Sequence, residues 1–151
     1  MTAEARALWA LTRVHRWPGR YLLVSLPQAS IADAARLVEV SVRDGVALYF
    51  AALVVESDEV SLTIAEPTWM AVAAHVDHTA VAGPYAAITL DLSIDLGVCG
   101  YLLPAAARLA AAGVSIVPQC AYRKDHLLIR EEDADRALVI LNDIVVEASA
   151  P

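Results

Sequence analysis

Apolar and polar positions along the chain follow two different periods, one typical of strands and one typical of helices. Compact runs rich in β-branched and aromatic residues predict strands. These runs are residues 21–26, 46–55, 60–64, 85–92, 114–122 and 126–129. Stretches with apolar residues three and four apart predict helices. These stretches are residues 2–12, 31–42, 67–74, 100–112 and 131–142, and residues 144–147 can close the sheet as a last strand.

The order of these elements repeats after about 68 residues, which marks an internal duplication. Residues 45–48 (Gly-Val-Ala-Leu) align with residues 113–116 (Gly-Val-Ser-Ile), each glycine ending a helix before a strand. Each half has the order β-α-β-β-α, with a closing strand clear only in the second. This order predicts an α+β protein built from two ferredoxin-like (βαββαβ) modules, with antiparallel sheets covered by helices. Because one half alone buries little core, the two are expected to pack as one unit.

Three segments follow from this repeat. Residues 1–16 form an N-terminal helix, residues 17–80 the first module and residues 81–151 the second. The joint between the modules is expected within residues 75–84, whose sequence HVDHTAVAGP lacks a clear period.

Composition narrows the class of protein. Hydrophobic residues make up 58% of the 151 residues, yet the longest apolar run, Val46–Val55, is about half the length that a membrane-spanning helix needs. Without a secretion signal, this composition predicts a cytoplasmic oligomer that buries the apolar surplus in its fold or in a subunit interface. The net charge of −7 argues against nucleic acid and anionic membranes as partners. Cys99 and Cys120 are expected to be reduced, largely buried thiols.

The first candidate site is the loop around Gly97 and Gly100, between a predicted strand and a predicted helix. One interpretation is a tight strand-to-helix turn. The other is a bare backbone whose N–H groups, at the positive end of the helix dipole, bind a carboxylate or a phosphate. The spacing excludes the dinucleotide fingerprint, and no Walker-type sequence occurs.

Thiol, imidazole and charged groups give further candidates. A zinc site could draw on His75, His78, Cys99, Cys120 and His126, but the sequence has no Cys-x-x-Cys pair. Cys99 with His126 could form a nucleophile and base in an enzyme.

The charged triplet Arg123-Lys124-Asp125 is most simply a solvated turn. If it lies beside the glycine loop, Asp125 is available to an ammonium group and Arg123 to a carboxylate.

The order of several short motifs resembles the tandem ACT-domain family of bacteria, whose animal relatives include cytosolic arginine sensors. In the second half these motifs are residues 95–102 (DLGVCGYL), 114–122, 125–126 and 129–133 (IREED). In the first half they are residues 18–21 (PGRY), 49–51 (YFA) and 57–62 (SDEVSL). The resemblance covers roughly residues 17–145.

The resemblance implies two ACT modules and a regulatory, amino-acid-binding protein without a cofactor, rather than an enzyme. In this family the effector lies at an interface between domains, against the loop from the first strand to the first helix. Carried over to this chain, the ligand would contact the loop residues Asp95, Leu96, Gly97, Val98, Cys99, Gly100 and Tyr101. Gln119, Arg123 and Asp125 would add polar groups, and Tyr49, Phe50 and Ala51 would form the opposite wall.

The chain departs from the family pattern at hydroxyl and carboxylate positions. Gly97 and Cys99 replace Ser and Thr in the loop, Cys120-Ala121 replaces Ser-Thr, and Arg123-Lys124-Asp125 replaces Asp-Thr-Asp. These changes disfavour arginine and favour a neutral or acidic amino acid as the ligand. The expected partner is a second copy of the chain or a regulated enzyme. A small enzyme using Cys99 and His126, and an interaction subunit without a ligand, are the alternatives.

Overall fold

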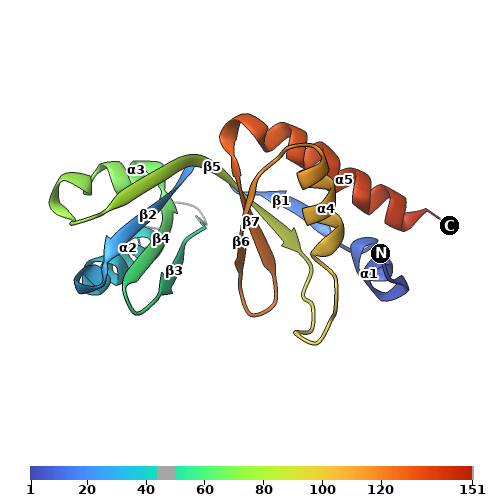
Figure 1. The fold of residues 1–151 in the computed structure, drawn as a ribbon, viewed down its shortest axis with the longest axis horizontal. Coiled ribbons are helices and arrows are strands. Elements are labelled where there is room, and N and C mark those ends of the chain that lie inside the picture. The colour runs from blue at the N-terminus through green and yellow to red at the C-terminus, as the bar shows by residue number, and fades with distance from the viewer. Residues whose placement is uncertain (44–49, 151) are drawn as a thin grey trace. The chain divides into compact units, whose positions relative to one another are not determined.

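Two units with the same strand order make up the chain, as the computed structural model of residues 1–43 and 50–150 shows (Figure 1). Unit 1 combines residues Met1–Arg16 with Ala86–Pro151, and unit 2 comprises Trp17–Tyr85. The N-terminal segment therefore belongs to the same unit as the C-terminal half of the chain.

Unit 2 is a four-stranded antiparallel sheet with helices. Its elements are β2 (Tyr21–Pro27), the 3₁₀ turn Gln28–Ser30, α2 (Ile31–Arg43), β3 (Ala52–Val55), β4 (Glu59–Ala65), α3 (Glu66–Met70), the 3₁₀ turn Ala73–His75 and the first part of β5 (Ala80–Asp91). The strand order is β3-β4-β2-β5. Strand β5 closes the sheet by pairing with β2, in a register that includes Tyr21 opposite Tyr85. Its core joins β2 and β4 to Trp69 of α3 and Leu37 of α2.

Unit 1 has the same strand order but takes its closing strand from the N-terminus. Its elements are α1 (Ala3–Trp9), β1 (Arg13–Arg16), the second part of β5, α4 (Leu103–Ala111), β6 (Ile116–Cys120), β7 (Asp125–Arg130), the 3₁₀ turn Glu131–Asp133 and α5 (Ala134–Ser149). The order is β1-β5-β7-β6. Strand β1 pairs antiparallel with β5, from Arg13 opposite Asp91 to Arg16 opposite Ile88.

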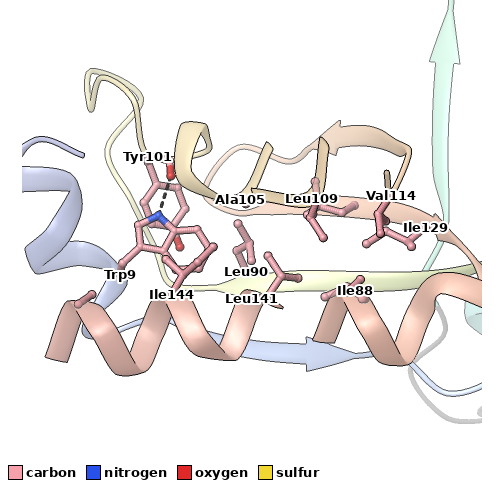
Figure 2. Packing of buried hydrophobic residues seen from close by; sticks show 13 residues of the cluster. Trp9, Ile88, Leu90, Tyr101, Ala105, Leu109, Val114, Ile129, Leu141 and Ile144 are labelled. Atoms are coloured by element: carbon pink, nitrogen blue, oxygen red, sulfur yellow. Dashed lines mark hydrogen bonds between the residues drawn. The ribbon is translucent and has the colours of Figure 1, made fainter. Parts of the chain in front are cut away.

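The core of unit 1 lies between its sheet and helices α1, α4 and α5 (Figure 2). Ile88 and Leu90 of β5 and Ile129 of β7 meet Leu109 of α4 and Leu141 of α5, and all five side chains are fully buried. This packing anchors both ends of the segment between β5 and α4, which carries the candidate site.

The α+β, ferredoxin-like prediction is confirmed, with three corrections to individual elements. Residues 144–147 are not a strand, because Ile144 and Ala148 continue the helical spacing of the buried face of α5. Residues 80–84, expected in the joint, are the start of β5, where pairing with β2 orders a segment without a local pattern.

Strand β1 was not predicted, because residues 1–16 were assigned to an N-terminal helix, which in the structure ends at Trp9. The turn at residues 44–45 and the start of the strand predicted for residues 46–55 lie outside the described residues. Within the described part of the chain, no helix is long and apolar enough to cross a membrane.

Candidate functional site

A cleft of about 310 Å³ opens in unit 1 between the loop that follows β5 and the hairpin that joins β6 to β7. The loop contributes residues between Ile94 and Leu103, and the hairpin contributes Cys120–Asp125. A second hollow of about 230 Å³ adjoins it and shares Asp95 and Arg123. The two segments are far apart in the sequence, and the fold brings them to one edge of the unit.

Three interactions hold the hairpin against the loop. The backbone N–H of Ile94 donates to the carbonyl of Arg123 at 3.2 Å. The Arg123 guanidinium donates to the hydroxyl of Ser93 at 3.2 Å. Lys124 forms an ion pair with Asp91, and this hydrogen bond lowers the pKa of the Asp91 carboxyl. Interactions within unit 1 therefore hold the two sides of the cleft together.

The two glycines of the loop have different roles. Gly100 has a φ of +80°, a left-handed conformation that side chains rarely adopt, just before the first turn of α4. Gly97 has no such φ, and its N–H donates to the Asp95 carboxylate at 2.8 Å in a local turn. The tight-turn interpretation therefore explains Gly100 by conformation, while a Cβ at Gly97 would lie 3.1 Å from that same carboxylate oxygen.

Tyr101 lines the cleft, and contacts with Trp9 and Thr12 hold it in place. Its ring stacks on Trp9 with centroids 5.4 Å apart, and its carbonyl accepts a hydrogen bond from the Trp9 indole at 2.7 Å (Figure 2). Its hydroxyl is 2.7 Å from the Thr12 hydroxyl. Burial raises the pKa of Tyr101 to about 12, so the phenol stays protonated at neutral pH.

Charges of both signs border the cleft. Within residues 1–43 and 50–150, Lys124 pairs with Asp91, whereas Arg123 has no carboxylate partner.

Asp125 accepts a hydrogen bond from the Cys120 thiol, and this bond raises the thiol pKa. A protonated thiol is a poor nucleophile, so Cys120 is better suited to binding than to covalent chemistry.

Seven of the predicted contact residues line this cleft together. They are Asp95, Leu96, Val98, Gly100, Tyr101, Arg123 and Asp125. Gly97, Cys99 and Gln119 do not line it. The cleft also includes Leu102, Leu103 and Tyr122, which the sequence reasoning missed; an aromatic residue in a charged hairpin turn was the available signal for Tyr122.

The residues predicted as an opposite wall belong to unit 2. Phe50 is buried there, and its ring packs on Tyr21 and Trp17 at centroid distances of 6.1 and 6.4 Å. Ala51 precedes β3 and is half-buried. Tyr49 lies outside the described residues.

The side chains of His126 and His78 have structural contacts. His126 is buried, its Nδ1 lies 2.7 Å from the Thr89 hydroxyl, and burial lowers its pKa. His78 packs edge-on against Trp69 with centroids 5.1 Å apart, in unit 2 with His75. Cys99 and Cys120 are both exposed, so the prediction that these thiols are largely buried is wrong. Neither Cys99 nor His126 lines the cleft. In the described part of the chain no group of three or more His, Cys, Asp or Glu is placed to hold a metal.

Comparison with known proteins points to one family for the part of the chain that carries the cleft. Residues 80–143, from the start of β5 into α5, match the family model of the ACT domain. None of the curated proteins matches the sequence of this chain.

Solved structures share the fold. A Vibrio cholerae protein of unknown function, described as a possible transport protein, is 19% identical with a TM-score of 0.69 over 94% of this chain and 96% of its own. An Agrobacterium tumefaciens protein is 18% identical, with a TM-score of 0.67 over 89% of each chain. The ligand-free regulatory subunit of aspartate kinase from Thermus thermophilus is 13% identical, with a TM-score of 0.60 over 87% of this chain and 95% of its own. The fold is therefore of the ACT type.

Proposed function

We propose that this protein is a regulatory protein that binds a free amino acid in the cleft of unit 1. The observation that carries the proposal is the meeting of the loop and the β6–β7 hairpin around Arg123, a guanidinium without a carboxylate partner in the described residues. The ACT-domain match over residues 80–143 supports it, as does the likeness in fold to a subunit named as regulatory.

The charges assign a role to each end of an amino acid. Arg123 binds the α-carboxylate, since a guanidinium forms paired hydrogen bonds with that group. Asp125 binds the ammonium, and the loop from Asp95 to Gly100 closes over the ligand. A neutral or acidic amino acid fits these positions, because Arg123 and the neighbouring Lys124 repel a cationic side chain.

Regulation requires a partner, for which we propose a second copy of the chain or an enzyme. The apolar surplus of the composition supports self-association. We also propose a cytoplasmic location, which fits two exposed free thiols, Cys99 and Cys120. A relation to the animal arginine sensors stays a prediction.

The enzyme alternative has less support from the side chains. Asp125 keeps the Cys120 thiol protonated, and His126 contacts Thr89 within the buried part of unit 1. A nucleophile and a base must converge on one cleft, and Cys99 and His126 line neither hollow.

The test is the substitution Arg123→Gln, measured by isothermal titration calorimetry with each L-amino acid that raises the melting temperature of the wild type. Loss of charge-assisted hydrogen bonds is expected to lower affinity by about tenfold to a hundredfold. Because Arg123 is exposed, the melting temperature without ligand should not change.

The matched control is Arg36→Gln, which removes an exposed arginine from α2 of unit 2 and should leave affinity unchanged. If no L-amino acid at millimolar concentration raises the melting temperature of the wild type, the proposed function is wrong.

A further inference from the structure

We infer that the ligand is a neutral amino acid with a large aliphatic or aromatic side chain, such as leucine or phenylalanine. This inference rests on the proposed function and adds the specificity of the same cleft.

The first observation is a ring of exposed apolar side chains around the opening. Leu96 is 71% exposed, Leu103 64% and Tyr122 75%. They come from the loop, the start of α4 and the hairpin, and all three line the cleft. Three large apolar groups that converge on one concave surface lose unfavourable contact with water when an apolar group binds between them.

The second observation is that polar groups in the wall already have partners within the protein. The Tyr101 hydroxyl contacts Thr12, and the Cys120 thiol donates to Asp125. A hydroxyl or amide on the ligand side chain would lose its water and gain no partner from these groups, which costs free energy. Val98, Leu102 and Ala121 complete an apolar lining next to them.

The charged groups lie where they suit the ends of the ligand rather than its side chain. Asp95 and Arg123 border both hollows, and Ser93 belongs to the smaller one. A zwitterion bound beside Arg123 therefore shares the cleft with apolar lining residues, which include Val98 and Leu103. A second carboxylate placed there would lose its water, while Arg123 already binds the α-carboxylate and Lys124 is paired with Asp91, so an acidic amino acid is disfavoured.

Size sets the other limit. The cleft of about 310 Å³ is at the lower end of the range for small-molecule sites, about 300–1,000 Å³. This volume accommodates one free amino acid with a large side chain. The inference therefore names the apolar amino acids as a class.

The experiment compares L-leucine, L-phenylalanine, L-serine and L-glutamate by calorimetry on the wild type and on Leu103→Ser. Leucine and phenylalanine are expected to bind at least about tenfold more tightly than serine, from the apolar area that they bury. Leu103→Ser should weaken leucine about tenfold and leave serine unchanged. Leu103 is exposed at the first position of α4, so serine there should not impair folding.

The control is Val139→Ser, which removes an apolar side chain of similar exposure, 62%, from α5 outside the cleft. It should bind leucine as the wild type does. Tighter binding of serine or glutamate than of leucine overturns the inference and leaves the proposed function standing. Absence of binding by every amino acid overturns both. Leucine that fails to bind, together with weaker dimers of Leu103→Ser in sedimentation, would assign the ring to contact with a second copy.

Discussion

The two units share one strand order and differ in the connection between their first strand and first helix. In unit 2, β2 ends at Pro27 and the chain passes through a single 3₁₀ turn into α2 at Ile31. In unit 1, β5 ends at Asp91 and α4 begins only at Leu103. The longer connection forms one side of the cleft. A duplicated fold can thus acquire a candidate site in one copy through a single loop.

The hairpins opposite these connections differ in charge. The turn between β3 and β4 contains Glu56 and Asp58, whereas the turn between β6 and β7 contains Arg123 and Lys124. A basic turn beside a loop that contains Asp95 presents both signs of charge to one small volume. This pairing favours a zwitterion in unit 1, and unit 2 supplies only acidic groups at the corresponding turn.

Unit 1 also depends on a segment that unit 2 does not need. Its closing strand is β1, and Trp9 of α1 is fully buried in its core. Arg6 donates to the carbonyl of Ala150 at 2.7 Å and so ties α1 to the end of α5. Residues 1–16 thus complete the unit that carries the cleft, and the substitution Trp9→Ala tests that dependence.

Trp9→Ala is expected to have the largest effect. Removing a fully buried tryptophan leaves a cavity and deletes the hydrogen bond to Tyr101, so unit 1 should lose about 3–5 kcal/mol of stability. Compared with the wild type, Trp9→Ala should increase the rate of amide hydrogen exchange more in β7 of unit 1 than in β4 of unit 2. Leu11→Ala, at a side chain 68% exposed, should change stability by less than about 0.5 kcal/mol. Equal loss of protection in both units would contradict the dependence of unit 1 on its N-terminal segment.

Much of this fold could be predicted because its signals are local. The positive φ of Gly113 after α4 and the helical spacing of Ala137, Leu141 and Ile144 both depend on neighbours within a few residues. The position of the loop and of Arg123 and Asp125 followed from the same order of elements. The cleft itself exists because the loop after β5 lies against the β6–β7 hairpin. The spacing of residues in the sequence does not determine that contact.

The missed features depend on contacts between distant parts of the chain. Strand β1 exists because Arg13–Arg16 pair with β5, and nothing in that short polar run marks it as a strand. Ala80–Pro84 consist of small or turn-forming residues apart from Val81, and they become a strand through pairing with β2. Leu103 and Tyr122 were not predicted as site residues, because single exposed apolar residues are common on protein surfaces. Only the fold places both of them in the lining of one cleft.

A second test uses pH to separate the units. Burial lowers the pKa of His126 below its ordinary value of 6.5. Asp125 raises this pKa by a smaller amount, and Lys124 lowers it slightly. Below about pH 6.5, His126 takes up a proton in the unfolded chain but not yet in folded unit 1. The free energy of unfolding therefore decreases as the pH falls toward the folded pKa. His126→Gln keeps a hydrogen-bonding side chain beside Thr89 and removes this titration. Urea denaturation at pH 7.5 and 5.5 should show a smaller loss for the variant than for the wild type, and equal losses would exclude His126 as the source.

A smaller change in stability than that of Trp9→Ala is expected from Gly100→Ala, which separates the two roles of this glycine. A Cβ built at Gly100 meets nothing within 4 Å, so the cost is that of a left-handed φ alone, about 1 kcal/mol. Gly113→Ala is the matched control, because Gly113 has a φ of +72°, equally open surroundings and no place in the cleft lining.

Both variants should therefore lose similar stability in urea denaturation, but only one should affect the ligand. Gly100 lines the cleft, so its new methyl group enters the space that the proposed amino acid needs. Leucine affinity measured by calorimetry should fall by about tenfold in Gly100→Ala, through disturbed hydrogen bonds to the loop, and stay unchanged in Gly113→Ala. If both variants bind leucine as the wild type does, Gly100 only eases the entry into α4, and the ligand must contact the cleft elsewhere.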